Sequence, residues 1–525
     1  MKKDTSHTIK RAERFYVILI GEGLLVGAAA GLVILAYRIV LTYAAEWLQS
    51  ILEYARRSPV TMALWFVVLA VLAVIVGLLV KMEPMISGSG IPQLEGEMAG
   101  KLTQNWWRVL AAKFVGGALS LFAGLSLGRE GPSIQLGAMV GKGISKGLDR
   151  GKTEEKFLLT CGASAGLSAA FHAPLAGVMF CLEEVHKNFS VSVLVSVMTA
   201  SVTADFLSAN ILGMEPVFNF SIGNVLPYDH YALLIVLGVI LGLLGVFYNW
   251  FTLKVQSLYQ KAGWLNEITR LMIPFMLAGI LGFTMPEVLG SGHDLIMDLT
   301  SGNMVLQGVL LLLFVRFVFS AVSFGSGAPG GIFFPLLVIG AFIGGAFGLF
   351  CVRYFGMDMD YVNNFIMLAM AGYFTAIVRA PLTGIILIFE MTGSVSQMLS
   401  LSVISIVAYI VASLMHSEPI YESLLDRLLK KQGKKMTDKE IETGGQKVLS
   451  RFVVMHGASL VGKQVRDIRW PDNCLLVAIQ RGGKEVIPKG KTVILASDEI
   501  VTMTDERDEG NVHDQMHQLC MDSIS

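Results

Sequence analysis

The sequence predicts an all-α polytopic membrane domain followed by a small α/β domain. Only 16% of the 525 residues are charged, whereas soluble domains carry about a quarter. Apolar residues gather in long runs such as Phe15 to Tyr37 and Met62 to Val80, each close to the roughly 20 residues that cross a bilayer. Further apolar runs lie near 107–124, 190–213, 231–251, 269–285, 304–323, 333–350 and 397–415. Near Ser423 the composition becomes charged and polar, and short β-like runs follow.

These changes in composition divide the chain into segments. We expect a cytoplasmic N-terminus (1–14), a membrane domain (15–430), a linker (431–444), a small α/β domain (445–507) and a C-terminal tail (508–525). In the α/β domain, Leu475 to Gln480 and the run KEVIP flank the turn RGG, which predicts a β-hairpin. The first apolar run is too long, and stands among too many similar runs, to be a cleaved signal peptide.

Charge and cysteine usage exclude several classes of function. The formal net charge is zero, with 41 basic and 41 acidic residues, so we expect no nucleic-acid partner. The five cysteines form no CxxC pair, which indicates neither a disulfide framework nor a metal site. We expect no cofactor. The basic N-terminus predicts that the chain begins in the cytoplasm.

The membrane domain contains an internal repeat, with halves at about 15–213 and 231–425. GSGIPQLEG begins at Gly88 and GSGHDLIMD 202 residues later; GREGPSIQLGA begins at Gly128 and GIFFPLLVIGA 203 residues later. HAPLAGVMFCLEE begins at His172, and RAPLTGIILIFEM follows 207 residues later. Glycine- and proline-interrupted segments in corresponding positions of two membrane halves are typical of a transport site near the middle of the bilayer.

The interrupted segments have the composition that an anion path requires. A helix that begins inside the membrane presents unpaired backbone N–H groups and a partial positive charge to an anion. Irregular backbone at that depth is tolerated only around a buried or watery cavity. GSGIP, GREGP and GSGAPGGIFFP each combine glycines with a proline that suits the first helical turn. Close helix packing through small residues is the alternative for any one of them.

With their order and spacing, these motifs resemble those of the CLC family of chloride channels and proton/chloride exchangers. The resemblance covers about Phe15 to Leu429 and includes APLAG…EE and PIYESLL. It implies the CLC fold, in which two inverted repeats with broken helices build each subunit of a homodimer. Each subunit then carries its own pore.

The resemblance also implies residue roles. Ser89 and Tyr421 match the two hydroxyl groups that coordinate the central anion, and the backbone N–H groups of Ile332 and Phe333 complete that site. Gly128, Arg129, Gly131 and Gly331 match further backbone of the anion path. Serine in the first motif implies chloride rather than fluoride.

Two glutamates match the family's proton-transfer groups. Glu130 corresponds to the gate, whose carboxylate occupies an anion position when charged and leaves it when protonated. Glu184 corresponds to the inner proton acceptor, and an acid there is typical of exchangers, whereas channels tend to have an apolar residue. From the residues alone, the alternatives are a pair of Glu130 with Arg129 at a helix start, and two solvated acids at Glu183 and Glu184.

The α/β domain resembles the C-terminal ligand-binding domain of RCK-type potassium-transport regulators, also called TrkA-C, through the pieces SLVGK, VAIQRGG, IPKG and SDEI. The resemblance implies dimerisation and, in some bacteria, binding of cyclic di-AMP. Ile468, Arg469 and Trp470 lie near the expected dimer cleft. A purely structural dimerisation module is the equal alternative.

The sequence therefore predicts a homodimeric, multi-pass cell-membrane transporter, bacterial in type, that exchanges chloride for protons. Its N- and C-termini are expected in the cytoplasm, with a nucleotide such as cyclic di-AMP as the possible regulator. The alternatives are a passive chloride channel of the same fold and a nucleotide sensor anchored in the membrane. An enzyme is not indicated, because the chain has no HExxH motif, no P-loop and no recognisable nucleophile–base pair.

Overall fold

The computed structural model describes residues 5–187, 191–213, 217–218, 225–263, 265–302, 304–431, 433, 447–481, 484–505 and 508–521. It divides into two compact units, Met1–Asp426 and Arg427–Ser525. Most of the expected linker, residue 432 and residues 434–444, lies outside the described residues.

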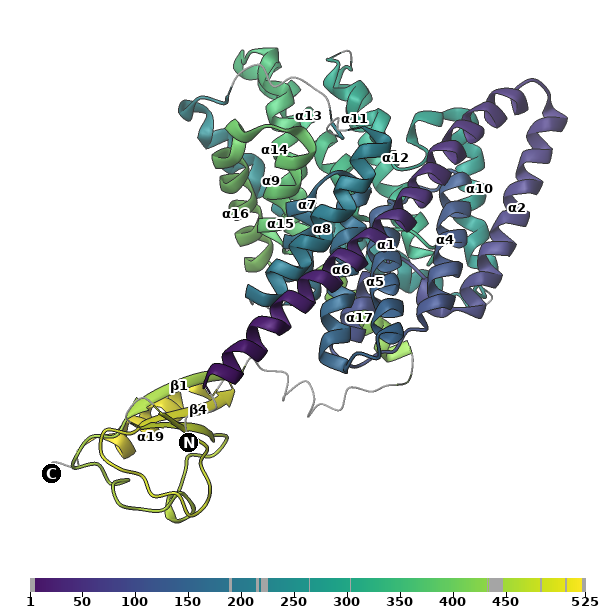
Figure 1. Cartoon of the computed structure of the whole chain (residues 1–525). Helices are drawn as coiled ribbons and strands as arrows, with labels where there is room; N and C mark the ends of the chain where they lie inside the picture. The colour runs from purple at the N-terminus through teal and green to yellow at the C-terminus, as the bar shows by residue number, and fades with distance from the viewer. Residues whose placement is uncertain are drawn as a thin grey trace. The chain divides into compact units, whose positions relative to one another are not determined.

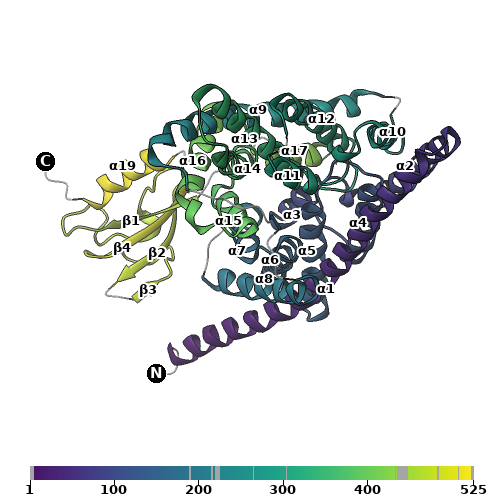
Figure 2. The ribbon, with the colours of Figure 1, turned by 90° about the horizontal axis from the view of Figure 1, so that it is seen from above.

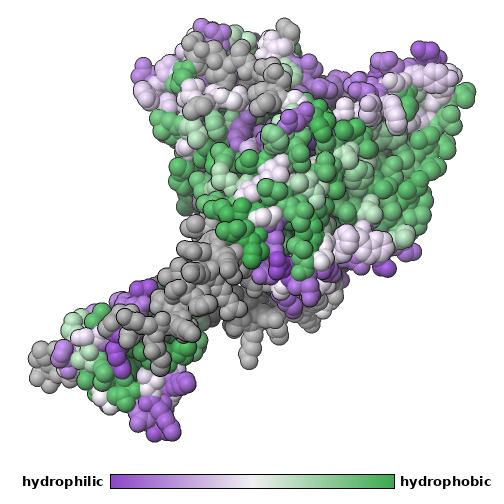
Figure 3. Space-filling view, viewed as in Figure 1, coloured by the Kyte–Doolittle hydropathy of each residue, from purple (hydrophilic) through white to green (hydrophobic). Residues whose placement is uncertain are grey.

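The first unit is built from α-helices (Figure 1). Seven described stretches are long and apolar enough to cross a membrane. Figure 3 shows apolar side chains gathered in a band across the visible face of this unit, with polar side chains above and below the band. The helices are α1 (Thr5–Ala55), α2 (Pro59–Met82), α3 (Ile91–Met98), α4 (Trp106–Phe122), α5 (Glu130–Gly147), α6 (Lys152–Phe171), α7 (Pro174–Phe180), α8 (Val191–Leu212), α9 (Tyr231–Lys261), α10 (Thr269–Thr284), α11 (His293–Thr300), α12 (Leu306–Gly325), α13 (Phe333–Phe355), α14 (Val362–Val378), α15 (Pro381–Thr392), α16 (Met398–Leu414) and α17 (Ile420–Lys431).

The two sequence repeats fold alike. The short helices α3 and α11 each follow a glycine in the left-handed region, Gly90 with φ 91° and Gly292 with φ 92°. Only glycine adopts this conformation without strain, which explains why the GSG turn recurs in both halves. Helices α5 and α13 correspond in the same way, as do α7 and α15.

Each repeat also uses a buried cation to hold its GSG turn. Lys113 of α4 donates to the carbonyl oxygens of Ile86 and Gly88 at 2.9 and 2.6 Å. Arg316 of α12, 203 residues later, donates to the carbonyl oxygens of Val288 and Gly290 at 2.5 and 2.7 Å. Carbonyl oxygens in this number compensate part of the cost of burying a charge.

The two repeats contact each other reciprocally. The carboxylate of Glu183, at the end of α7, accepts from the backbone N–H groups of Leu382 and Thr383 at the start of α15. Glu390, at the end of α15, accepts from the N–H groups of Leu175 and Ala176 at the start of α7. Figure 2 shows α7 and α15 side by side in the middle of the unit. Reciprocal contacts of this kind are the mark of two-fold symmetry.

The same two-fold relation holds where α5 and α13 begin. Gly128 and Gly331 exchange two backbone hydrogen bonds, of 2.6 and 2.8 Å. From that junction the two helices run to opposite sides of the unit (Figure 1). The halves are therefore inverted, as the resemblance of the motifs implies.

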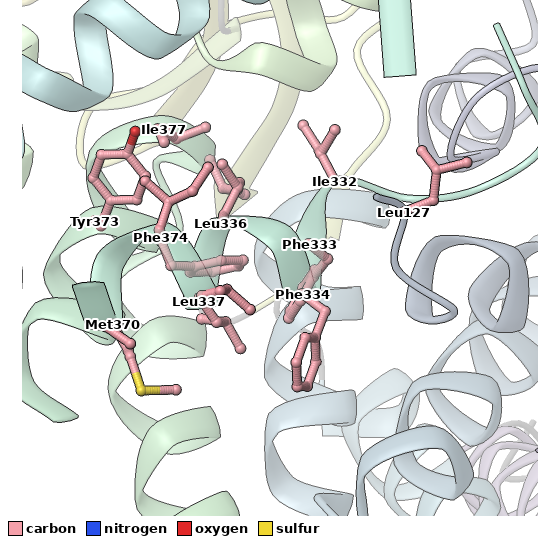
Figure 4. Close-up of a cluster of buried hydrophobic side chains, with 14 of the residues drawn as sticks. Leu127, Ile332, Phe333, Phe334, Leu336, Leu337, Met370, Tyr373, Phe374 and Ile377 are labelled. Atoms are coloured by element: carbon pink, nitrogen blue, oxygen red, sulfur yellow. The ribbon is translucent and has the colours of Figure 1, made fainter. Parts of the chain in front are cut away.

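Aromatic and aliphatic side chains of α13 and α14 fill the space behind this junction (Figure 4). Phe333 and Phe374 pack with their ring centroids 4.6 Å apart. The first turn of α13 is thereby fixed by buried apolar contacts rather than by a side-chain cap.

The second unit contains a four-stranded antiparallel sheet in the order β1–β4–β2–β3. Its elements are β1 (Lys447–Val453), β2 (Leu475–Arg481), β3 (Lys484–Val486), β4 (Glu499–Asp505) and α19 (Glu509–Cys520). Strands β2 and β3 form the predicted hairpin. The segment expected to be a tail contains α19, because Val512, Met516 and Cys520 recur every four residues and join the core.

The two faces of this sheet differ in what covers them. On one face, Phe452, Ile500 and Ile479 lie in register and belong to the core that includes α19. On the other, Leu449, Met503 and Leu475 lie in register across β1, β4 and β2, and the side chains of Leu449 and Leu475 are 60% and 57% exposed. Among the described residues, the second unit thus carries a row of apolar side chains on this sheet face, two of which are largely exposed.

The reciprocal caps of the membrane unit predict a stability effect. We expect Glu390→Ala to lower the free energy of unfolding by about 1–3 kcal/mol, because the N–H groups of Leu175 and Ala176 lose a charged acceptor. Glu390→Gln keeps an acceptor oxygen and should lose less. Thermal unfolding of the detergent-solubilised protein measures both variants, and an unchanged midpoint for Glu390→Ala would contradict the capping role.

Candidate functional site

Three glycine-rich turns meet at one place in the membrane unit. The N–H of Gly330 donates to the carbonyl oxygen of Gly88 at 3.0 Å, so the third motif contacts the first. The reciprocal bonds between Gly128 and Gly331 join the second motif to the third. A Cβ atom on Gly131 would lie 2.9 Å from both the Cβ and the carbonyl oxygen of Ser89. The turns approach this closely because glycine has no side chain.

Two helix N-termini point their first amides into this junction. Within the described residues, no side chain caps α5 at Arg129 or α13 at Ile332. Ile332 and Phe333 are fully buried, and so is Ser89, whose hydroxyl accepts a bond of 3.3 Å from the N–H of Ile91. Uncapped amides and the positive ends of two helix dipoles together favour an anion.

Glu130 places a carboxylate at this positive junction. Its side chain is fully buried, and the Arg129 Nε atom lies 3.9 Å from Glu130 Oε1. A Cβ atom built on Gly128 would lie 2.2 Å from Glu130 Oε2 and 3.1 Å from the backbone nitrogen of Phe334. The carboxylate therefore lies beside the start of α13, close to the backbone nitrogen of Phe334.

A cavity of about 570 Å³ opens onto Glu130. Its lining includes Arg129, Phe334, His172 and His293, and we name it the Arg129 cavity. The Arg129 side chain, which is 26% exposed, is thus accessible from one side of the unit, whereas Glu130 is buried in the wall of this cavity.

Tyr421 lies on the opposite side of the junction. Its side chain is fully buried, and its hydroxyl has no hydrogen-bond partner among the described residues. The ring of Phe180 lies between Tyr421 and Phe333, with centroid distances of 6.5 and 5.8 Å. A buried hydroxyl without a partner is costly unless a ligand completes it.

Glu183 and Glu184 point in different directions. They lie in a π-helical turn, Cys181–Val185, that continues α7, and such turns often occur at functional sites. Glu183 caps α15, whereas Glu184 is 5% exposed and faces Glu95 of α3. The alternative of two solvated acids is therefore wrong.

Sequence reasoning did not identify Glu95. Glu95 is 5% exposed, and its helix α3 packs against the π-helical turn that carries Glu184, so the two carboxyls interact electrostatically. A signal was available, because the repeat places Met297 at the corresponding position 202 residues later. An acid that one repeat has and the other lacks is a candidate for chemistry rather than for folding.

A second cavity, of about 520 Å³, reaches Glu95 from the side of α17. We name it the Glu95 cavity. At its mouth Lys187 and Glu422 form a salt bridge of 2.5 Å, and both side chains are nearly half exposed. Glu422 follows Tyr421 directly, so α17 contributes to both the junction and this cavity.

In the second unit, the three candidate nucleotide contacts differ in availability. Ile468 is buried in the core cluster, and the indole N–H of Trp470 donates to the carbonyl oxygen of Val465 at 2.9 Å. Arg469 is exposed. In the single copy of the chain, Arg469 is therefore the member of this trio with an accessible charge.

Two family models match the chain. The model described as voltage gated chloride channel matches residues 71–413. The chain belongs to this family. The TrkA-C domain model matches residues 449–512, within the second unit. Both matches agree with the resemblances that the sequence motifs indicate.

Curated relatives are similar over nearly their whole length. The H(+)/Cl(-) exchange transporter ClcA of Vibrio cholerae serotype O1 is 38% identical over 445 residues, which cover 82% of this chain and 94% of the relative. The ClcA protein of Salmonella arizonae is 34% identical over 432 residues, or 80% of this chain and 90% of the relative.

Solved structures of the voltage-gated chloride channel family show the same fold. A slow cyanobacterial Cl-/H+ antiporter matches with a TM-score of 0.76 and 29% identity, covering 79% of this chain and 99% of the antiporter. A eukaryotic CLC transporter matches with a TM-score of 0.66 and 21% identity, over 78% of this chain and 74% of that one. The predicted CLC fold is confirmed.

The close packing at Gly128 predicts a structural change in a single variant. In Gly128→Ala the new methyl group overlaps the position of Glu130 Oε2, so we expect the carboxylate to turn away from α13 and the unfolding midpoint to fall. A crystal or cryo-EM structure of the variant tests this directly. Gly147→Ala is the matched control, since a Cβ atom there meets nothing within 4 Å. A Glu130 carboxylate that keeps its place in Gly128→Ala would contradict the expected overlap.

Proposed function

We propose that the protein exchanges chloride for protons across the membrane. The observation that carries the proposal is the fully buried carboxylate of Glu130 beside the uncapped N-terminus of α13. In its charged form this carboxylate competes with chloride for the same amides. In its protonated form it has no charge to hold it there, and chloride takes the place. One location then binds either an anion or the carboxylate, which links proton movement to chloride movement.

The chloride ion is held by neutral donors. Ser89 and Tyr421 supply hydroxyl groups, and Ile332 and Phe333 supply backbone N–H groups. Gly128, Gly131 and Gly331 allow the backbone to approach the ion, and Arg129 keeps the path positive without a full countercharge at the binding point. Dipolar donors bind an anion reversibly, whereas a directly paired lysine or arginine would hold it more tightly. The unpartnered hydroxyl of Tyr421 supports this assignment.

Glu184 accepts protons on the other side of the junction. Its burial supports exchange over the alternative of a passive chloride channel, because a carboxyl at 5% exposure has little use as a solvated surface group. The relatives named as proton/chloride exchange transporters support the same choice. The alternative of a nucleotide sensor that uses its helices only as an anchor would leave the junction and both cavities without a role.

The chain is a multi-pass protein of a bacterial cell membrane, with both termini in the cytoplasm. The basic N-terminus and the TrkA-C unit that follows α17 support this orientation. The Glu95 cavity, to which α17 contributes, is then the cytoplasmic one and the Arg129 cavity the external one. Two copies form a homodimer in which each subunit has its own pore.

The TrkA-C unit regulates transport by binding a nucleotide between two copies. Its apolar row of Leu449, Met503 and Leu475 supports pairing, because an exposed apolar sheet face is stabilised by a partner. Arg469 supplies the charge-assisted contact to phosphate. Its neighbours Ile468 and Trp470 pack in the core of the domain and hold Arg469 in place. A ligand in this place alters transport only if it binds two states of the transporter unequally.

Glu130→Gln tests the exchange mechanism. The variant keeps the size of the side chain but does not titrate, so we expect chloride efflux from proteoliposomes to continue while chloride-driven proton uptake falls at least tenfold. Glu184→Gln should likewise reduce proton uptake, since the anion site is left intact. Proton uptake at the wild-type rate in Glu130→Gln would rule out Glu130 as the shared gate.

Calorimetry with cyclic di-AMP tests the regulatory unit in the full-length protein. We expect heat of binding, and Arg469→Ala should weaken the affinity about tenfold through loss of one charge-assisted contact. Arg466→Ala is the control, because Arg466 is also exposed and pairs only loosely with Asp467 at 3.6 Å. No heat with cyclic di-AMP or ATP, together with unchanged transport after truncation at Gln432, would leave a structural dimerisation module.

A further inference from the structure

We propose that Glu95 is a proton-relay residue, which passes protons between the Glu95 cavity and Glu184. The inference rests on the proposed exchange function and adds a residue to its inner proton route. When a proton moves outward from the cytoplasm, it first passes from water in the Glu95 cavity to the Glu95 carboxylate. It then passes to Glu184, and Glu95 returns to its charged form. The reverse transport direction uses the same steps in the opposite order.

The position of Glu95 between water and Glu184 is the first support. Its side chain forms part of the cavity wall, although the side chain as a whole is 5% exposed. Helix α3 also packs against the π-helical turn Cys181–Val185, which carries Glu184, and the charge of each carboxyl acts on the other. Glu184 itself is absent from the cavity wall, so a proton that enters through this cavity meets Glu95 first.

The hydrogen-bond environment of the pair is the second support. Among the described residues, neither oxygen of Glu95 nor Oε1 of Glu184 accepts a bond from a backbone N–H or a hydroxyl group. Two buried carboxylates that face each other repel strongly unless a proton lies between them. The pair therefore favours a state with one shared proton, which is the arrangement that proton transfer between the two groups requires.

The neighbours of Glu95 on α3 are occupied by structural contacts, whereas Glu95 is not. Gln93 donates to the carbonyl oxygen of Ser87 at 2.7 Å, and Glu97 pairs with Lys142 and accepts from Gln104. These contacts attach α3 to the surrounding turns and to α5. Glu95 makes no comparable contact, so its carboxyl is not needed to hold α3 in place.

Comparison of the repeats leads to the same conclusion. Helices α3 and α11 have the same length of eight residues and follow the same left-handed glycine. At the position of Glu95, α11 has Met297. The fold therefore forms this helix with an apolar residue in place of the acid. The acid is present only in the repeat whose helix faces Glu184.

The charges around Glu95 suit a relay rather than a fixed ion pair. Lys187, Glu422 and Glu184 are the charged groups that act on it most strongly. Lys187 is already bonded to Glu422 at the cavity mouth. The charge of Lys187 acts on Glu95 but is already paired with Glu422. Water has access to both Lys187 and Glu422.

Two substitutions at Glu95 separate a relay from a positioning role. Glu95→Gln keeps the shape and a hydrogen-bonding group but does not titrate; Glu95→Asp titrates but is one methylene shorter. A relay predicts that chloride-driven proton uptake in proteoliposomes falls about tenfold in the glutamine variant and stays higher in the aspartate variant. A positioning role predicts the reverse order. Chloride efflux from the same liposomes reports that each variant is folded, and Asp229→Asn, at an exposed acid far along the chain, is the control.

The outcomes distinguish this inference from the proposed function. Three results together support the relay. Proton uptake is lost in Glu184→Gln, it is reduced in Glu95→Gln, and it is faster in Glu95→Asp than in Glu95→Gln. If the wild type couples chloride to protons and Glu95→Gln takes up protons at the wild-type rate, the relay is overturned and exchange stands. The same holds if proton uptake by Glu95→Asp is no faster than that by Glu95→Gln. A wild type that moves chloride without protons overturns both.

Discussion

The backbone pairing of Gly128 with Gly331 is the constraint on which the rest of the membrane unit depends. It brings the starts of α5 and α13 together inside the protein, where both helices present uncapped amides. A side chain at either glycine would separate them, because Cβ positions there meet Glu130, Gly131 or the first turn of α13 within about 3 Å. The backbone N–H groups at the junction are therefore exposed to each other only because the chain is broken and lined with glycine there.

The two halves repeat the side chains that hold the backbone in place but not three of the buried acids. Lys113 and Arg316 correspond, as do Glu183 and Glu390, and each pair makes the same kind of contact in its own half. At the positions that correspond to Glu95, Glu130 and Glu184, the second repeat has Met297, Phe333 and Met391. The contacts that hold the scaffold are thus symmetric, and the acids to which we assign proton transfer occur in the first repeat alone.

The sequence predicted the parts of the fold that depend on composition and on short motifs. Hydropathy located six of the seven candidate spans in the described residues but missed Met359–Val378, and the offsets of the glycine motifs predicted two halves whose broken helices meet. It could not separate Glu183 from Glu184, because the difference depends on a π-helical turn and on the distant start of α15. It missed Glu95 for a related reason: a carboxyl on a short helix reads as a solvated group until tertiary packing places it against another acid. The α19 helix was missed because an isolated polar segment with four apolar residues among twelve has little helical stability without its sheet.

The layer between the two cavities favours exchange over free conduction. The Arg129 cavity ends at Glu130 and Phe334, the Glu95 cavity ends at Glu95 and Val185, and the two share no lining residue. Between them, Phe180, Phe333 and Tyr421 are fully buried and pack ring against ring. An ion cannot cross such a layer while it is closed, so each transfer requires a local rearrangement. In the proposed mechanism, the buried carboxylate of Glu130 provides this rearrangement at the junction when it takes up or releases a proton.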